Sequence, residues 1–333
     1  MGFSGRNGSR RTICSPQRNY QMKEINKNFR VIFIGARIVG YRCLHALLDA
    51  NINIVGAVTL DDKKKDVTTA FKTFSDLFES YTVPNKVFTK LNSPEIASWI
   101  RFRKPTLGIV VGVSQLISKD ILEIPKMGFI GMHPTFLPEG RGRAPIPWAL
   151  IKGMKSTGVS LFYCDAAADT GDILNQRRVP IYYEDTALTL GSRTDDIAIE
   201  LLLENLPKLA DGTAERIKQE ESKATYWAKR TPEDGKINWG LRTREIFDWI
   251  RGLTHPYPGA FGILQGKKIY IWGARESLDE RFGKPGEVIA ILPSSVLVAT
   301  GEGNILLTKL QFEGASEIDA DKSELKISDQ FEI

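Results

Sequence analysis

The segment that decides the fold is "RVIFIGARIVGYRCLHALLDANINIVGAVTL", residues 30–60. It opens with a β-branched apolar run that closes at Gly35, which is typical of a buried strand. Residues 38–50 then place apolar side chains at helical spacing, and residues 52–60 form a second buried run. A strand, a helix and a strand in this order predict a βαβ unit and therefore a parallel sheet.

The same alternation continues to about residue 210. A polar loop and a helix follow residue 60, and Ser118 is the expected N-cap of a later short helix. Further strands are expected at 106–113, 128–134, 157–165 and 173–181, and further helices at 95–104, 118–124, 146–154 and 186–210. This order predicts an α/β class with a mostly parallel sheet.

The sequence pattern changes near residue 211, where short strands separated by Gly/Pro turns begin. They are expected at 268–274, 285–292, 295–301 and 303–312. Regular short strands of this kind favour a small barrel or sandwich. We therefore expect four parts: a disordered basic arm at 1–29, an α/β domain at 30–210, a β-rich domain at 211–316, and a loose polar tail at 317–333.

Composition and charge exclude several classes of protein. The 333 residues are 42% hydrophobic and 26% charged, as in soluble globular proteins, and no apolar run approaches the roughly 20 residues that span a membrane. The net charge of +5 comes mainly from the first 30 residues, so the folded remainder is close to neutral. Charge alone therefore gives no case for a nucleic-acid partner, and none is expected.

The cysteines and the N-terminus indicate the compartment. Cys14, Cys43 and Cys164 are odd in number and widely spaced, which argues against a disulfide framework or a zinc site. Residues 1–21 lack the apolar core of a secretory signal, and Met22 is a candidate start. We expect a cytoplasmic protein without a metal; a homodimer is left open.

Two turn segments hold the candidate chemistry. His133, one of three histidines, ends an expected strand inside "GMHPTFLPEGRGRAPIPW" (131–148), and Asp169 lies in the turn "ADTGDIL" (168–174). Strands of open α/β sheets deliver functional groups at their carboxyl ends, so these two side chains could meet as a proton-transferring pair. The alternative is a purely structural role for each residue: His133 as a hydrogen-bonded core histidine and Asp169 as a turn former. The first βα turn, "GARIVG", is not the glycine fingerprint of dinucleotide binding.

Several motifs in order resemble the formyltransferase family that uses 10-formyltetrahydrofolate. They are "MHPTFLPEGRGRAP" (132–145), "TGVSLFYCDAAADTGDIL" (157–174), "ATYWAKRTPEDGKINW" (224–239) and "HPYPGAF" (255–261). The resemblance covers roughly residues 30–315. It implies a Rossmann-like catalytic domain followed by a smaller, OB-like open barrel, with 10-formyltetrahydrofolate as the formyl donor and no metal.

The resemblance also implies roles for individual residues. His133 and Asp169 match the catalytic histidine and aspartate, and Arg141 and Gly142 match a loop that shapes the substrate site. The residues expected beside the folate are Gly112, Val113, Gln115, Leu116, Ile117, Leu137, Pro138, Asp165, Ala166 and Ala168. Independently, Lys63–Lys65, Lys72 and Ser75 could contact a diphosphate.

One position departs from the family pattern. The family has Asn two residues before the histidine, where this chain has Gly131, and residues two apart in a strand share a face. Gly131 is therefore expected to leave a hole beside His133. Three readings follow: a water or another side chain, such as Gln115 or Ser114, replaces the amide; His133 itself polarises the formyl group; or the protein binds ligands without catalysis.

The resemblance leaves the acceptor amine open. "RGRAPIPW" (141–148) looks like the loop of sugar-nucleotide formyltransferases, and the basic Gly-rich loop of the tRNA enzymes is missing after residue 60. We therefore expect a nucleotide-linked amino sugar as substrate. The alternatives are formylation of methionyl-tRNA, and a catalytically silent protein that binds folate or a nucleotide sugar.

Overall fold

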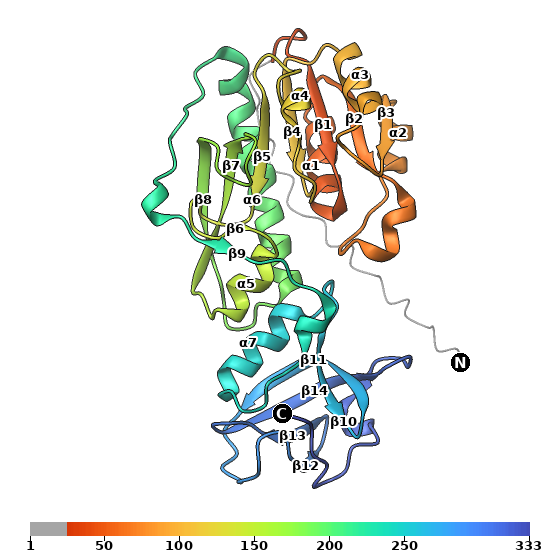
Figure 1. The fold of residues 1–333 in the computed structure, drawn as a ribbon, viewed down its shortest axis with the longest axis vertical. Helices are drawn as coiled ribbons and strands as arrows, with labels where there is room; N and C mark the ends of the chain where they lie inside the picture. The colour runs from red at the N-terminus through yellow and green to blue at the C-terminus, as the bar shows by residue number, and fades with distance from the viewer. Residues whose placement is uncertain (1–24) are drawn as a thin grey trace, which may run out of the picture.

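The computed structural model describes residues 25–333 as two units stacked along the long axis of the molecule (Figure 1). The expected basic arm and the candidate start at Met22 lie largely outside the described residues. Residues 25–29, however, belong to the fold: Phe29 is buried in the core, and Asn53 Nδ2 donates to the Lys27 carbonyl at 2.6 Å. Residues 25–29 are therefore part of the first unit, because Ile25 and Phe29 pack in its apolar core.

A seven-stranded sheet forms the first unit, in the order β3-β2-β1-β4-β5-β7-β8. The first five strands in this order are parallel, and β7 and β8 are antiparallel additions. The strands are β1 (Val31–Gly35), β2 (Ile54–Leu60), β3 (Asn85–Phe88), β4 (Leu107–Val111), β5 (Phe129–His133), β7 (Ser156–Tyr163) and β8 (Ile173–Pro180). The mostly parallel α/β sheet is confirmed.

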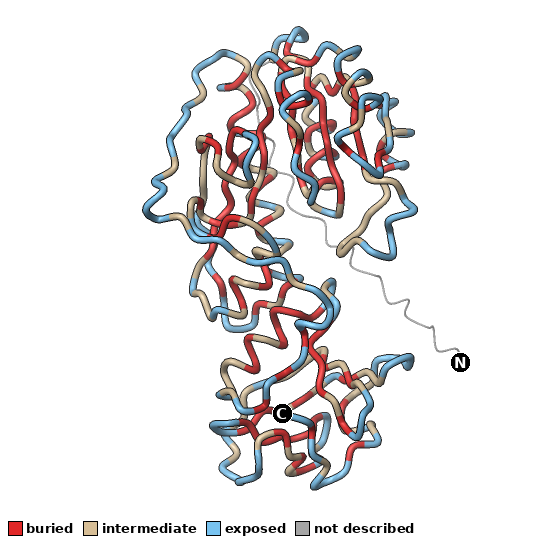
Figure 2. The backbone as a smooth tube through the Cα atoms, in the orientation of Figure 1, coloured by how far each residue is buried: buried red, intermediate tan, exposed pale blue. Residues whose placement is uncertain are grey.

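Helices cover both faces of this sheet, and the buried residues follow its strands (Figure 2). They are α1 (Arg37–Asp49), α2 (Ser75–Tyr81), α3 (Pro94–Phe102), α4 (Lys119–Leu122), α5 (Pro145–Ile151) and α6 (Ala187–Asp211). Local chemistry sets several of their starts. Ser93 caps α3 by accepting from Ile96 N, and Thr186 and Thr189 form a capping box at the start of α6.

The order of the strands positions the site. The connection from β1 leads outward to β2 and β3, whereas β4 and β5 lie on the other side of β1. Such a reversal opens a crevice at the carboxyl ends of the two central strands, where ligands bind in open α/β sheets. His133 is the last residue of β5 and therefore lies at this edge.

The second unit is β-rich and antiparallel, as expected, with one helix, α7 (Thr243–Leu253), against it. Its sheet has the order β10-β11-β14-β13-β12, with β15 paired to β14. The strands are β10 (Ala260–Leu264), β11 (Lys267–Ser277), β12 (Val288–Leu292), β13 (Ser295–Ala299), β14 (Asn304–Phe312) and β15 (Ile318–Asp319).

The expected loose tail at 317–333 is wrong. Phe331 is fully buried and stacks on Trp239 with ring centroids 4.9 Å apart, and Leu325 lies in the same core. Residues 317–333 are polar in overall composition because their apolar residues are few and widely separated. Those few fill the core of the second unit.

The segment between the units stays on the first unit for most of its length. Ile217 forms a bridge with Ile173 of β8, and β9 (Tyr226–Trp227) pairs in parallel with β6 (Arg141–Gly142). The chain therefore leaves the first unit only after Trp227. We call residues 212–228 the linker segment.

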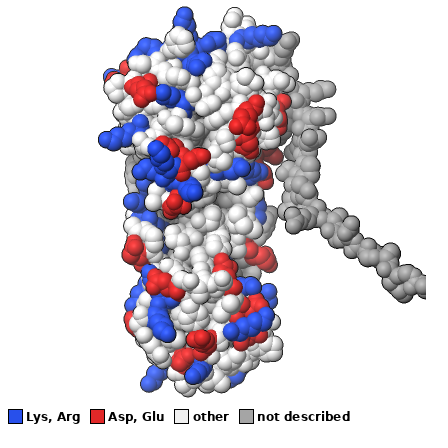
Figure 3. All heavy atoms as spheres, turned by 90° about the vertical axis from the view of Figure 1, so that its right-hand side faces the viewer, with Lys and Arg blue, Asp and Glu red and all other residues white. Residues whose placement is uncertain are grey.

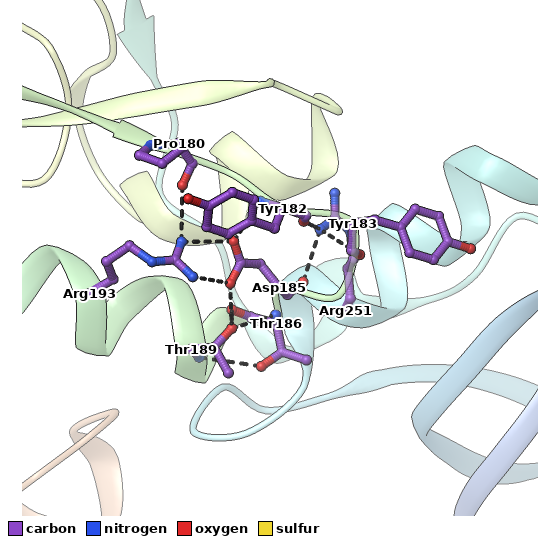
Figure 4. Close-up of polar contacts among 8 residues, drawn as sticks. All are labelled: Pro180, Tyr182, Tyr183, Asp185, Thr186, Thr189, Arg193 and Arg251. Carbon is purple, nitrogen blue, oxygen red and sulfur yellow. Dashed lines mark hydrogen bonds and ion pairs between the residues drawn. The ribbon is translucent and has the colours of Figure 1, made fainter.

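An arginine of α7 joins the units directly (Figure 4). Arg251 is buried, and its Nη1 donates to the carbonyls of Tyr182 and Asp185 at 3.0 and 2.9 Å, in the loop between β8 and α6. Its Nε donates to Asp248 at 2.6 Å. Within residues 25–333, no helix is both long enough and apolar enough to cross a membrane.

Candidate functional site

The structure brings His133 and Asp169 together at the carboxyl edge of the first sheet. His133 Nδ1 lies 3.6 Å from Asp169 Oδ2, and the two side chains are 8% and 17% exposed. The second ring nitrogen, Nε2, lies 2.9 Å from the Gly140 carbonyl oxygen. Asp169 is thus the more accessible member of the pair, and the imidazole is held from both sides.

The Gly140 contact assigns the tautomer of His133. A carbonyl oxygen only accepts hydrogen bonds, so Nε2 must carry a proton for this bond to form. The free position of a neutral ring is then Nδ1, which faces the carboxylate of Asp169. At 3.6 Å the carboxylate lies beyond hydrogen-bond distance of Nδ1 in this structure, but it is close enough to interact electrostatically with the ring.

Asp169 is held in a conformation that non-glycine residues seldom adopt. Its φ is 59°, in the left-handed region, and its Oδ2 accepts a hydrogen bond from Gly142 N at 2.9 Å. Two residues later the turn touches β7 so closely that a Cβ on Gly171 would lie 1.6 Å from the Tyr163 carbonyl oxygen. Only glycine fits there, and this close approach directs Asp169 toward His133.

Arg141 does not point into an open site. Its side chain is fully buried, and its N–H groups donate to Gln219, Glu221 and Tyr226 in five hydrogen bonds of 2.6 to 3.1 Å. A guanidinium has five N–H donors, so none remains for a ligand. The expected substrate contact of Arg141 is therefore corrected: it anchors the linker segment.

The expected hole at Gly131 is filled. A Cβ at this position would come within 2.8 Å of both Cys164 Sγ and Phe162 Cζ. Phe162 pairs with Gly131 across the sheet, which explains why the space is taken. Burial raises the pKa of the Cys164 thiol, so this cysteine stays protonated and is not a competing nucleophile.

Gln115 does not replace the missing amide. Its Nε2 donates to the Thr89 carbonyl and its Oε1 accepts from Leu91 N, both at 3.0 Å. These bonds turn the side chain toward the loop between β3 and α3. Ser114 contributes its carbonyl oxygen, which accepts from Arg143 at 2.8 Å.

Two segments expected to contact folate differ in what they expose within residues 25–333: the segment after β4 has free backbone N–H groups, whereas the 137–138 segment is largely packed. Gly112, Val113 and Leu116 follow β4 and have backbone N–H groups without a hydrogen-bond partner in the described part of the chain. Leu137, by contrast, is 1% exposed and packs against Phe162 and Ile173, so its side chain shapes the loop from within. The Pro138 carbonyl accepts from Thr225 N at 3.3 Å.

Three of the remaining folate-side residues, Asp165, Ala166 and Ala168, lie in the turn after β7. The Asp165 carboxylate accepts from Ala167 N at 3.2 Å and from the Thr170 hydroxyl at 2.7 Å, which closes the turn on itself. Ala166 and Ala168 are small residues on its exposed to half-buried surface, and Ile117 is buried beside α4. A planar ring could therefore approach the backbone of this turn.

Two arginines at the crevice were missed in the sequence. Arg37 lines the crevice at the ends of β1 and β4 together with Gly112, Ser114 and Thr68. Burial lowers the pKa of Arg37, Tyr257 opposes that shift and Arg143 adds to it. Within residues 25–333, neither Arg37 nor Arg143 forms an ion pair with a carboxylate. Their positions directly after a strand and within "RGRAP" were the signals available.

The lysine run lies on the connection between β2 and α2, and Ser75 is the first residue of α2. The Ser75 hydroxyl is exposed and 3.4 Å from Thr73 Oγ1, whose hydroxyl donates to Asp62 at 3.2 Å. Lys63–Lys65 are exposed in a short 3-10 turn. In the described part of the chain, no group of three or more His, Cys, Asp or Glu side chains is placed to hold a metal ion.

Family models cover most of the chain. Residues 29–206 match the model described as formyl transferase, and residues 229–323 match the one described as formyl transferase, C-terminal domain. The protein therefore belongs to the 10-formyltetrahydrofolate-dependent formyltransferase family.

The similar proteins include a tRNA formyltransferase and a solved N-formyltransferase. The methionyl-tRNA formyltransferase of Geobacter metallireducens is 32% identical over 295 residues, which is 87% of this chain and 93% of the relative. An N-formyltransferase from Helicobacter canadensis, solved with folinic acid and dTDP-3-aminofucose, has a TM-score of 0.64 at 18% identity, over 84% of this chain and 98% of that one.

A third comparison covers a longer protein. HypX from Aquifex aeolicus, in complex with tetrahydrofolic acid, has a TM-score of 0.65 at 19% identity over 87% of this chain. The match spans 46% of HypX, a little under half of its length. At these identities the solved structures establish the fold alone.

Proposed function

We propose that the protein transfers the formyl group of 10-formyltetrahydrofolate to the amine of a nucleotide-linked amino sugar. The observation that carries this proposal is the His133–Asp169 pair, 3.6 Å apart at the carboxyl edge of the sheet. Arg37 lines the crevice at that edge, and Arg143 reaches it by donating to the Ser114 carbonyl at 2.8 Å. The pair supports the transfer chemistry, and the arginines support an anionic acceptor.

The donor fits the backbone around the pair. The pterin ring of a folate carries donors and acceptors along its edge, and the unpartnered N–H groups of Gly112, Val113 and Leu116 could bind it. When bound, the folate supplies the activated formyl group. Every other part of the reaction falls to side chains of this chain.

The reaction moves one formyl group and returns one proton. The acceptor nitrogen attacks the formyl carbon, a tetrahedral intermediate forms, and the bond from that carbon to N10 of the folate breaks. The proton lost by the amine passes to the Asp169–His133 pair and then to N10. The folate therefore leaves as tetrahydrofolate. An imidazolium at His133 adds positive charge beside the oxygen of the intermediate.

A nucleotide sugar matches the charge at the crevice. Arg37 and Arg143 carry two guanidinium groups, as suits the two negative charges of a diphosphate. On the face drawn in Figure 3, Lys and Arg are interspersed with Asp and Glu and form no broad basic patch. Binding a tRNA through many phosphates favours a broader basic surface.

The second candidate acceptor is methionyl-tRNA. The 32% identity to the Geobacter metallireducens enzyme extends over both units, which favours this acceptor. The two candidates differ in their salt dependence. Each phosphate contact adds about 0.9 to the slope of log affinity against log salt for duplex nucleic acid, so a tRNA substrate would be released steeply as salt rises.

The test is a formyl-transfer assay with the full-length protein. The purified protein is mixed with 10-formyltetrahydrofolate and, in turn, with nucleotide-linked amino sugars and methionyl-tRNA, and the formylated product is identified by mass. We expect formylation of an amino sugar that changes little with salt. His133→Ala and Asp169→Asn should each lower the rate by on the order of a hundredfold or more.

The control is His255→Ala, because His255 is exposed in the second unit. Normal transfer by His133→Ala would remove the pair from the mechanism. Formylation of methionyl-tRNA alone would assign the second candidate. Binding of folate without turnover of any acceptor would favour a catalytically silent protein.

A further inference from the structure

The linker segment reaches the candidate site through one side chain. Gln219 Nε2 donates to the carbonyl oxygens of Asp169 and Gly171 at 2.8 and 2.7 Å. These residues are 50 and 48 positions away in the sequence. A residue outside both matched family domains therefore contacts the turn that carries the candidate carboxylate.

The orientation of the Gln219 amide follows from its partners. Arg141 donates from Nε and Nη2 to Gln219 Oε1 at 3.1 and 2.8 Å, and a guanidinium can only donate. The two backbone carbonyls on the other side can only accept. The Oε1 and Nε2 atoms are thus assigned without ambiguity, and the reverse orientation would lose all four contacts.

Gln219 and the 140–142 loop hold Asp169 at opposite ends. Gln219 fixes the backbone carbonyl, and Gly142 N fixes carboxylate oxygen Oδ2. A left-handed φ is unfavourable for a residue other than glycine, and it persists only when its surroundings over-determine it. Gln219 supplies such a constraint on the backbone of the Asp169 turn.

We infer that Gln219 is a positioning residue that keeps the Asp169 carboxylate facing His133 Nδ1. The inference rests on the proposed function only in assigning Asp169 a part in the reaction. Arg141 completes the arrangement, because it joins Gln219 to the loop whose Gly140 carbonyl binds His133 Nε2. The linker segment is thereby a working part of the site, in addition to joining the two units.

The first test needs no turnover. The chain has three histidines, so proton–nitrogen correlation spectra of the imidazole groups contain few signals, and His133→Ala identifies those of His133. Gln219→Glu keeps the length and the acceptor for Arg141 but loses the amide donors. Gln219→Met keeps the length and loses both. Both variants should move the His133 signals in the direction seen in Asp169→Asn, while those of His45 and His255 stay in place.

Two outcomes would overturn the inference. One is unchanged His133 signals in both Gln219 variants when Asp169→Asn does move them. The other is a change in Gln219→Glu alone, which would point to the added charge. Thermal unfolding followed by circular dichroism confirms that each variant is folded. A protein that transfers no formyl group still gives these spectra, so failure of the proposed function is distinguishable.

The second test separates positioning from binding. A misplacement of about 1 Å at a reacting group can cost on the order of a hundredfold in rate. We expect Gln219→Met to lower kcat by about that factor with a KM for folate close to that of the parent. Gln311→Met is the matched control, since Gln311 bonds Trp272 in the second unit and should leave kcat unchanged. An unchanged kcat in Gln219→Met would contradict the inference.

Discussion

Closely packed residues set the geometry of the His133–Asp169 pair. A side chain on Gly171 would collide with the Tyr163 carbonyl, and one on Gly131 would collide with Cys164 and Phe162. His133 has both ring nitrogens engaged, by Gly140 and Asp169. The pair is therefore pre-organised by contacts that allow little adjustment, as proton transfer between fixed groups requires.

The packing at Gly131 predicts the effect of restoring the family residue. Gly131→Asn should lower the free energy of unfolding by about 1–3 kcal/mol, because an overpacked core forces its neighbours out of position. Adding Cys164→Ala should recover part of that loss. Urea unfolding of both variants and of Cys164→Ala alone measures the coupling.

The double variant then tests the amide itself. If an amide at position 131 assists the reaction, the Gly131→Asn, Cys164→Ala protein should form product faster than Cys164→Ala. A Gly131→Asn protein as stable as the parent would show that the space beside Phe162 is not closed.

Between elements, the contact of α1 with α6 carries an unusual carboxyl group. Arg42 of α1 lies 3.4 Å from Asp195 of α6 and is also paired with Asp196. Burial raises the pKa of Asp195 to about 7; Arg42 opposes this rise and Asp196 adds to it. Arg42 therefore compensates Asp195 only in part.

This contact predicts how stability depends on pH. The pKa of Asp195 is raised on folding, so its contribution to stability is complete below about pH 4 and is lost as pH rises toward 7. Asp195→Asn should make stability less dependent on pH between about 5 and 7, by up to about 1.4 kcal/mol per pH unit.

The measurement is urea unfolding of both proteins from pH 5 to pH 8. Asp66→Asn, exposed on the connection between β2 and α2, is the control and should keep the parental slope. Equal slopes for Asp195→Asn and the parent would show that Asp195 is ionised throughout this range.

On the scale of the whole molecule, the two units are held by buried polar contacts as well as by apolar packing. Arg251 of α7 reaches three carbonyls of the first unit, those of Tyr182, Tyr183 and Asp185 (Figure 4). Arg230 lies between the rings of Trp148 on α5 and Trp249 on α7, 4.8 and 4.6 Å from their centroids. Such contacts favour one fixed arrangement of the units.

Replacing Arg251 should therefore lower the stability of both units together. Arg251→Met keeps most of the apolar stem but leaves Asp248, itself buried, without its nearest partner. Breaking a buried pair costs about 3–5 kcal/mol when the remaining charge has no other partner, and Arg244, 2.9 Å from Asp248, should keep the loss below that range. Calorimetry should show a lower Tm, or two transitions where the parent has one.

Arg242→Met provides the comparison, because the Arg242 side chain is 66% exposed at the start of the same helix. Exposed pairs contribute about 1 kcal/mol or less, so its Tm should stay near that of the parent. A similar small change for both variants would mean that Arg251 does not hold the units together.

Much of this organisation could be predicted from the sequence. The β-branched runs and helical spacings of residues 30–60 predicted the parallel sheet, and the change of pattern after residue 211 predicted a β-rich second unit. The position of His133 followed from the same reasoning, because a residue that closes a strand lies at the edge of its sheet. These features depend on neighbours in the chain, and periodicity records them.

Other features depend on contacts between distant segments. Gln219 meets Asp169 across 50 positions, and Arg141 meets Glu221 across 80. Phe162 fills the space at Gly131 only because β7 pairs with β5 in one register. A sequence pattern carries no record of which side chains share a packed interior. By itself the sequence determined the elements, their order and the residues capable of the chemistry; the tertiary structure decided which of them are free to perform it.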